Sequence, residues 1–175
     1  QGTAGLELAT QAKAMGALPE AVLVPCGGGG LTAGVALALA TALPRARVHT
    51  VEPEGFDDTR RSLDAGQRLG NEAGGRTLCD ALMAPMPGEL TFSINRRLVA
   101  SGLSVDESAV RQAVGFAFRT LKLVVEPGGA VALAAVLSGK LPVRGRSVAV
   151  ILSGGNVDWS TFREALDRAG DRTGA

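Results

Sequence analysis

Short apolar runs along the chain alternate with longer segments of helical character. Three runs, 21–25, 47–52 and 147–152, predict strands because they are rich in valine and end at glycine or proline. They are apolar almost throughout, which is typical of parallel strands covered on both faces. Residues 31–43 predict a helix packed on several sides, whereas 66–88 lack a clear period and predict a loop. The alternation indicates an α/β fold with an open, mostly parallel sheet and helices on both faces.

Residues typical of the ends of helices predict three further helices. Ser104 and Glu107 have the spacing of a capping box at the start of one helix. A second helix starts at Pro127, which suits a first helical position, and ends before Gly139. Asp158 has the side chain to cap a third helix close to the end of the sequence.

Composition and charge narrow the class of protein. The chain has 175 residues, 46% of them hydrophobic, which supports one ordinary domain with a real core and excludes disorder. Its 18 basic and 17 acidic residues give a charge of +1, so no electrostatic argument favours nucleic acid or an anionic membrane. No apolar run reaches the ~20 residues of a membrane helix.

With only two cysteines, Cys26 and Cys79, we expect a cytoplasmic protein. Since the first residue is Gln1 rather than Met, we expect a portion of a longer chain.

Four consecutive glycines, Gly27 to Gly30, join the first predicted strand to the following helix. Without Cβ atoms, such a loop can turn several backbone N–H groups toward one point, and the helix start adds the positive end of its dipole. The pattern predicts a phosphate site. It lacks the lysine of a Walker loop and the spacing of a dinucleotide fingerprint. The alternative is a glycine-rich turn with only a packing role.

Two more glycine loops carry polar residues. Ser153 follows the third predicted strand, and ligands of open α/β sheets lie at the carboxyl ends of strands, so this loop and the first one can share a ligand. A plain strand-to-helix turn is the equal alternative. Glu126 precedes Pro127 and is either a site carboxylate or simply a favourable charge at a helix start. Its spacing alone favours the second interpretation.

An acidic turn follows the second predicted strand, with Glu52, Glu54, Asp57 and Asp58 close together. Carboxylate oxygens in a turn can hold Mg²⁺ or Ca²⁺, and the alternative is a solvated surface turn. The single histidine, His49, lies in the strand itself, where a core or edge position is the simpler expectation than a catalytic triad.

The glycine loops together resemble those of the threonine/serine dehydratases and serine racemases. These are pyridoxal-phosphate enzymes of the tryptophan-synthase-β-like fold, so the resemblance implies that this chain is part of their large domain. The resemblance extends from Gln1 to about Asp158, and segments 79–83 and 87–92 resemble bacterial threonine dehydratases in particular. The loops that carry it are Val-Pro-Cys-Gly-Gly-Gly-Gly-Leu at 24–31, Glu-Pro-Gly-Gly-Ala at 126–130 and Leu-Ser-Gly-Gly-Asn-Val-Asp at 152–158.

The resemblance implies a role for several residues. Ser153 would share a hydrogen bond with the pyridine nitrogen, and a hydroxyl there favours β-elimination over transamination because it cannot stabilise a protonated ring as an aspartate does. Glu126 would line the ring side of the pocket. The cofactor phosphate would be held by Gly27, Gly28, Gly29, Gly30 and the Leu31 amide. A divalent cation such as Mg²⁺ would be held by Glu52, the Phe56 carbonyl and Asp58.

One part of the family's machinery has no counterpart in this chain. In proteins of this family, the lysine that binds the cofactor lies in a Ser-x-Lys-like segment of the N-terminal half. None of the three lysines of this chain, Lys13, Lys122 and Lys140, stands in such a segment. The resemblance therefore implies that residues 1–175 are the C-terminal part of the cofactor-binding large domain. The N-terminal half, with the small domain and the lysine, is absent, so no catalytic residue is expected in this chain.

The activity implied for the parent protein is that of a threonine dehydratase (threonine ammonia-lyase). Such an enzyme eliminates water from L-threonine or L-serine and yields a 2-oxo acid and ammonia. Serine racemase and hydroxyaspartate dehydratase are alternatives within the family. A phosphate-ligand-binding fragment without chemistry is the alternative from another class. The partners expected are an amino-acid substrate and a second copy in a homodimer of the parent, without nucleic acid or membrane.

Overall fold

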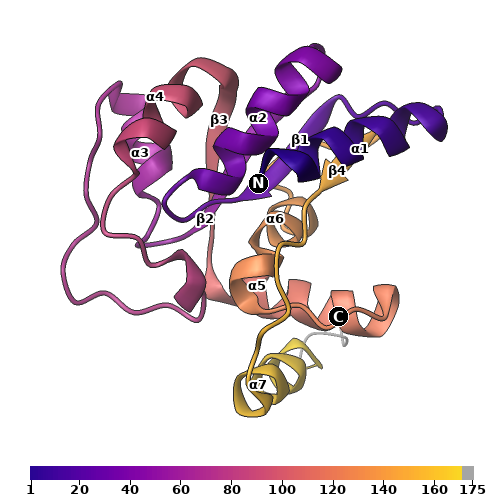
Figure 1. The fold of residues 1–175 in the computed structure, drawn as a ribbon. Helices are drawn as coiled ribbons and strands as arrows, with labels where there is room; N and C mark the ends of the chain where they lie inside the picture. The colour runs from indigo at the N-terminus through magenta and orange to yellow at the C-terminus, as the bar shows by residue number, and fades with distance from the viewer. Residues whose placement is uncertain (171–175) are drawn as a thin grey trace.

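Four parallel strands form the centre of the fold in the computed structural model, which describes residues 1–170. Their order across the sheet is β3-β2-β1-β4, with bounds Ala21–Pro25 for β1, Arg47–Pro53 for β2, Val99–Val105 for β3 and Val148–Val150 for β4 (Figure 1). Every pair of neighbours is parallel. The predicted α/β architecture with an open parallel sheet is thus confirmed.

Helices connect the strands and cover the sheet. Their bounds are Gly2–Ala14 for α1, Gly30–Ala42 for α2, Asp58–Ala65 for α3, Glu89–Leu98 for α4, Glu107–Phe116 for α5, Pro127–Leu137 for α6 and Trp159–Gly170 for α7. A short 3₁₀ helix, η1, spans Asp80–Leu82, and a π-helical segment, η2, spans Ala117–Leu121.

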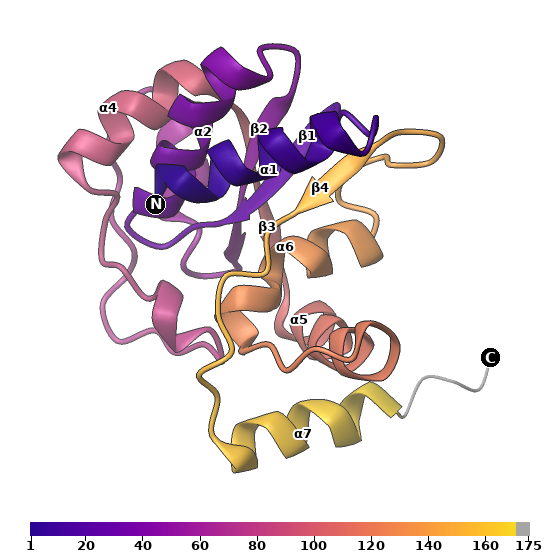
Figure 2. The ribbon, with the colours of Figure 1, turned by 45° about the vertical axis from the view of Figure 1, so that its right-hand side comes forward.

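The side chains of β1 explain why helices lie on both faces of the sheet. Successive residues of a strand point to opposite faces, and all five residues of β1 are buried. Val22 and Val24 pack in a cluster with residues of α1 and α2, whereas Leu23 packs in a second cluster with α5 and α6. Figure 2 shows α1 and α2 on one side of the strands and α5 and α6 on the other.

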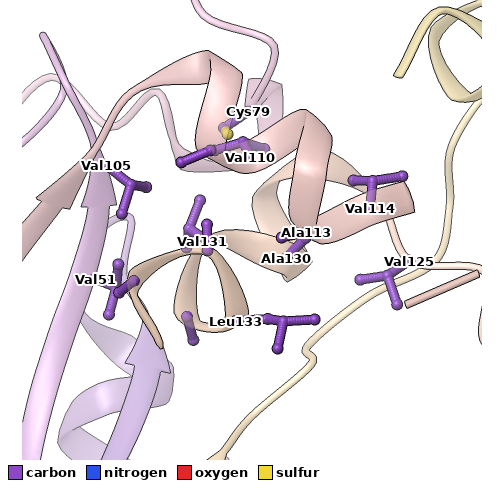
Figure 3. Close-up of a cluster of buried hydrophobic side chains, with 14 of the residues drawn as sticks. Val51, Cys79, Val105, Val110, Ala113, Val114, Val125, Ala130, Val131 and Leu133 are labelled. Atoms are coloured by element: carbon purple, nitrogen blue, oxygen red, sulfur yellow. The ribbon is translucent and has the colours of Figure 1, made fainter. Parts of the chain in front are cut away.

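The second cluster is the larger part of the core. Val51 of β2 and Val105 of β3 contribute to it from the sheet, Val110 and Val114 from α5, and Val131 from α6 (Figure 3). All five side chains are fully buried. The small residues of α6 let this helix pack closely between the sheet and α5, which is why its nine residues from 127 to 135 are all buried.

The register of the sheet places the ends of the strands at one edge. Pro25 of β1 lies beside Val51 of β2, and Pro53 of β2 beside Val105 of β3. On the other side of β1, Leu23 lies beside Val150. The segments that follow the four strands, including the glycine loop after β1 and Ser153 after β4, therefore leave the sheet from the same edge.

The structure corrects two expectations about strands and caps. Residues 99–105 form β3, where Ser104 pairs with Glu52 of β2, so Ser104 cannot be the helix cap. Asp106 has that role in α5, because its carboxylate accepts a hydrogen bond from the Ala109 N–H at 2.8 Å. The last strand is also shorter than predicted, with three residues in place of six, because β4 pairs only with β1.

Other boundaries are as predicted. Pro127 occupies the first turn of α6, and Gly139 follows the end of that helix with a φ of 73°. Asp158 accepts a hydrogen bond from the Thr161 N–H at 3.0 Å at the start of α7. Segment 66–88 is irregular except for η1. In the described part of the chain, no helix has the length and apolar character to cross a membrane.

Candidate cofactor site

The glycine loop after β1 presents a set of unpaired backbone donors. Gly29 is the N-terminal cap of α2 and has a φ of 88°, a left-handed conformation that favours glycine. Within residues 1–170, the N–H groups of Gly27 to Leu31 donate no hydrogen bond to backbone or side chain. Cβ atoms at Gly28 and Gly30 would meet no other atom within 4 Å. An anion therefore has open space beside donors that lack acceptors, at the positive end of a helix dipole.

The 3₁₀ helix η1 packs against both this loop and the start of α6. A Cβ atom at Gly27 would lie 3.3 Å from the Leu82 Cα, and one at Gly128 would lie 3.3 Å from the Leu82 Cγ. Leu82 thus touches both glycine segments, although Gly27 and Gly128 are far apart in the sequence. The sequence pattern did not predict this contact, since segment 66–88 has no periodicity to place it.

Glu126 faces the loop that follows β4. Its backbone N–H donates to the Gly154 carbonyl at 3.0 Å, and its Oε2 accepts from the Asn156 N–H at 3.0 Å. A Cβ atom at Gly154 would lie 2.5 Å from the Glu126 Oε1, so only glycine permits this approach. Glu126 caps α6 with its backbone, but its carboxylate makes no cap hydrogen bond to the helix. The carboxylate therefore stands at the start of α6 and faces the loop after β4.

A cleft opens beside this pair. It has a volume of about 220 Å³ and is lined by Glu126 and Pro127, by residues 156–158 and by residues of segment 77–80. Ser153 is exposed at the end of β4, next to the strand that carries the glycine loop. The glycine loop and Ser153 thus follow neighbouring strands at one edge of the sheet, and Glu126 is bonded to the loop that contains Ser153.

The acidic turn after β2 differs from a solvated surface turn. Glu52 is 0% exposed, and its two carboxylate oxygens accept the backbone N–H groups of Thr59 at 2.9 Å and Arg60 at 2.7 Å. Burial raises the pKa of Glu52 to about 8, although these two N–H groups act in the opposite direction. Asp58 is also buried, and its Oδ1 accepts from the Asn71 side chain at 2.6 Å.

The carboxylates of Glu52 and Asp58 accept hydrogen bonds from the protein itself. Both oxygens of Glu52 are directed at the start of α3, and residues 1–170 hold no group of three or more His, Cys, Asp or Glu side chains suited to a metal ion. The Oδ2 atom of Asp58 is buried without a hydrogen-bond partner. A divalent cation at Glu52, Phe56 and Asp58 stays a prediction from the resemblance, and no step of the chemistry below depends on it.

Both cysteines are buried thiols, and His49 is a buried strand residue. His49 lies in β2 with its Nδ1 2.8 Å from the Ser101 Oγ of β3, and burial lowers its pKa. Cys26 borders the glycine loop, and its Sγ lies 3.4 Å from the Thr59 Oγ1. Among the described residues neither thiol is hydrogen-bonded to the imidazole, which pairs with Ser101 across two strands of the sheet.

We expect neither cysteine to react with iodoacetamide in the native protein at pH 8. Burial raises the pKa of both Cys26 and Cys79 to about 12, so about one thiol in ten thousand is the nucleophilic thiolate at that pH. Peptide mass mapping should find both cysteines unmodified before unfolding in urea and alkylated afterwards. Rapid native alkylation of Cys26 would show that the glycine loop opens away from α3.

The three lysines lie away from the cleft. Lys13 is exposed on α1, the Lys122 Nζ donates to the Arg119 carbonyl at 2.7 Å, and the Lys140 Nζ lies 3.9 Å from the Glu54 Oε1. None of them is among the residues that line the space beside Glu126. The residues of this chain can therefore hold a phosphate and border a ring, but they place no amine there.

A glycine loop with unpaired donors at the end of a parallel strand, with a serine and a glutamate at the same edge of the sheet, is typical of an anion-binding site. Comparison with known proteins identifies the class further. Residues 1–154 match the family model described as "Pyridoxal-phosphate dependent enzyme", and the chain belongs to this family.

Individual relatives are dehydratases and racemases. The chain is 38% identical over 170 residues to the L-threonine ammonia-lyase of Thermotoga maritima, covering 96% of this chain and 40% of that protein. It is 36% identical over 174 residues to a serine racemase of Arabidopsis thaliana, covering 94% and 51%. A crystal structure of the T.th. threonine deaminase superposes with a TM-score of 0.85 at 49% identity, covering 90% of this chain and 56% of that one. The chain thus spans about half the length of the relatives it matches.

Pyridoxal phosphate fits the residues that the structure brings together. The unpaired N–H groups of Gly27 to Leu31 suit its phosphate, because they offer several donors around open space. Glu126 lines the cleft, and Ser153 lies in the loop to which Glu126 is bonded, which suits the ring. The roles of these residues toward the cofactor were predicted from the resemblance and stay predictions.

Proposed function

We propose that this chain is the C-terminal portion of the cofactor-binding domain of a pyridoxal-phosphate-dependent threonine dehydratase. The parent protein eliminates water from L-threonine or L-serine and produces a 2-oxo acid and ammonia. The observation that carries the proposal is the glycine loop. Its five consecutive N–H groups, unpaired within the described residues, follow β1, which lies next to β4, the strand that leads to Ser153. The similarity to threonine ammonia-lyase and threonine deaminase supports the choice of reaction.

Each residue has a distinct part in this chemistry. When bound, pyridoxal phosphate supplies an electron-withdrawing ring that makes the α-proton of an amino acid acidic. The N–H groups of Gly27 to Leu31 hold the phosphate and so fix the position of the ring. The Ser153 hydroxyl shares a hydrogen bond with the pyridine nitrogen, and it leaves that nitrogen less positive than a carboxylate would. Glu126 borders the ring from the first turn of α6.

The same arrangement serves a serine racemase or a hydroxyaspartate dehydratase. The similarity to a plant serine racemase is nearly as high as that to the ammonia-lyase, at 36% against 38% identity. Substrate choice in this proposal depends on groups that this chain does not contain, because its own residues contact the phosphate and the ring. Product analysis therefore has to separate these reactions.

A phosphate-ligand-binding module without chemistry is the second candidate. It is favoured by the positions of Lys13, Lys122 and Lys140, none of which lines the cleft beside Glu126. Such a module would bind pyridoxal phosphate reversibly and would not retain it after unfolding.

Borohydride reduction of the natural full-length protein tests the proposal. Reduction fixes a lysine-bound cofactor covalently, so we expect a pyridoxyl adduct on a lysine other than Lys13, Lys122 and Lys140, located by peptide mass mapping. With L-threonine, the unreduced protein should release a 2-oxo acid and ammonia in equal amounts. Formation of D-serine from L-serine as the main reaction would favour the racemase. Bound cofactor without an adduct or any turnover would overturn the enzyme assignment and favour the binding module.

A further inference from the structure

Helix α4 touches the glycine loop on the side away from the open space. The Thr91 Oγ1 donates to the Gly28 carbonyl at 2.6 Å, and it also lies 3.1 Å from the Gly88 carbonyl. The Gly88 N–H donates to the same Gly28 carbonyl at 3.2 Å. One turn further along α4, the Asn95 Nδ2 donates to the Gly29 carbonyl at 3.3 Å. Two side chains of one helix therefore hold two successive carbonyls of the loop.

Holding a carbonyl also directs the next N–H group. The peptide bonds of residues 1–170 are trans, and in a trans peptide the C=O of one residue and the N–H of the following residue point in opposite directions. With the carbonyls of Gly28 and Gly29 turned toward α4, the N–H groups of Gly29 and Gly30 point to the opposite side. That side is the open one, since Cβ atoms at Gly28 and Gly30 would meet nothing within 4 Å.

Asn95 is buried, and the hydrogen bond to the Gly29 carbonyl offsets part of the cost of burying its amide. Its side chain is 1% exposed and lies on the same helix as the buried Phe92, where an apolar residue would avoid the cost of burying an amide. The amide oxygen has no hydrogen-bond partner, so the bond to Gly29 is the polar interaction that Asn95 makes. The contact is tight, because a Cβ atom at Gly29 would lie 2.9 Å from the Asn95 Nδ2 and 3.0 Å from the Thr91 Oγ1.

We propose that Thr91 and Asn95 are positioning residues that orient the Gly28 and Gly29 peptides so that the next two N–H groups face the cofactor phosphate. The inference rests on the proposed function, because it assigns the anion to pyridoxal phosphate. It assigns to α4 a role in phosphate affinity, although neither side chain lies on the ligand side of the loop. Each carbonyl also accepts one backbone N–H group, that of Gly88 at Gly28 and that of Ala33 at Gly29. Removing either side chain leaves its carbonyl with this one hydrogen bond, so the peptide is held less firmly and the N–H group that follows is directed less precisely at the phosphate.

Binding of three probes to the full-length apoprotein tests the role of Thr91. Pyridoxal phosphate and inorganic phosphate engage the loop, whereas pyridoxal lacks the phosphate. The variant Thr91→Val keeps the shape of the side chain and removes its hydroxyl. We expect it to weaken the affinity for pyridoxal phosphate and for inorganic phosphate by roughly 5- to 10-fold, the effect of one hydrogen bond, with pyridoxal affinity unchanged. Thr91→Ser should restore phosphate affinity, because it keeps the donor.

Asn95→Leu supplies a second variant, and Ser93→Ala is the matched control on the same helix. The Ser93 Oγ donates to the Leu90 carbonyl within α4 and makes no contact with the loop, so its removal should change none of the three affinities. Asn95→Leu should behave as Thr91→Val does. Pyridoxal phosphate should slow hydrogen–deuterium exchange of the peptide that contains Gly28 to Leu31 less in both variants than in Ser93→Ala, because fewer of its N–H groups donate to the phosphate.

The outcomes separate this inference from the proposed function. Wild-type phosphate affinity and loop exchange in both Thr91→Val and Asn95→Leu would overturn the positioning role and leave the cofactor assignment intact. An equal loss of pyridoxal and pyridoxal phosphate affinity would overturn it as well, because it would indicate a general structural role. A wild-type protein that binds neither pyridoxal phosphate nor inorganic phosphate would overturn the proposed function together with this inference.

Discussion

Replacing Gly29 by alanine is expected to lower the free energy of unfolding by about 3 kcal/mol and to weaken the affinity for pyridoxal phosphate by roughly a hundredfold. The φ of 88° at this residue costs a side chain about 1–2 kcal/mol. The added Cβ would also lie 2.9 Å from the Asn95 Nδ2, and such overlap costs about 1–3 kcal/mol. The loop has to move away from α4, so the Gly29 and Gly30 N–H groups lose their direction. Each hydrogen bond from an N–H group to an anion that is lost weakens binding by about 1.5–3 kcal/mol.

Urea denaturation of the apoprotein measures the first effect, and Gly28→Ala is its matched control. A Cβ atom at Gly28 would meet no other atom within 4 Å, and Gly28 has no positive φ, so this variant should unfold within about 0.5 kcal/mol of wild type. If Gly29→Ala unfolds at the same urea concentration as Gly28→Ala, the close contact between the loop and α4 is not part of the native state.

The variant Gly129→Ala is expected to separate the two sides of the cofactor site. A Cβ atom at Gly129 would lie 2.7 Å from the Gly154 carbonyl oxygen and 2.8 Å from the Gly154 nitrogen, both of which are backbone atoms. The loop after β4 must then move away from α6. Its hydrogen bonds with Glu126 would break, which should lower the free energy of unfolding by about 2 kcal/mol and the affinity for pyridoxal by roughly tenfold. The affinity for inorganic phosphate should stay at the wild-type value, because the glycine loop after β1 is untouched.

Gly128→Ala provides the control for this variant in the same turn of α6. Its Cβ would lie 3.3 Å from the Leu82 Cγ, a side-chain atom that can shift by a few tenths of an ångström, and alanine is more favourable than glycine in a helix by up to about 1 kcal/mol. We expect it to unfold at or above the wild-type urea concentration and to bind both probes normally. Loss of phosphate affinity in Gly129→Ala would contradict the division of the site into a phosphate side and a ring side.

The sequence predicted the two central strands of the sheet, β1 and β2, well, and it predicted the outer strands, β3 and β4, poorly. The apolar runs of β1 and β2 have no competing interpretation, and their observed bounds differ from the predicted ones by at most one residue. Strand β3 contains Ala100, Ser101, Gly102 and Ser104, because an edge strand is partly solvated and needs few apolar residues. The polar pattern therefore predicts no strand there, and Ser104 alone is typical of a helix start.

The site residues that could be predicted are those that directly follow a predicted strand or precede a predicted helix. The glycines after β1, Ser153 and Glu126 each follow or precede a regular element, and the parallel sheet brings strand ends together. The contacts of Thr91 and Asn95 with the loop could not be predicted in that way, because they join segments more than sixty residues apart. A signal did exist, since polar residues four apart on a helix lie on the same face and can reach one partner.

The two sides of the site are also separated along the direction of protein synthesis. The glycine loop and the helix that orients it are complete in the nascent chain once Asn95 has been added, whereas the partner of Glu126, Asn156, is added some sixty residues later. Chains emerge from the ribosome N-terminus first and fold as their segments become available. Strand β4 must join the edge of β1 before the later contact can form. A growing chain therefore acquires the means to bind an anion before it acquires the means to select the ring attached to it.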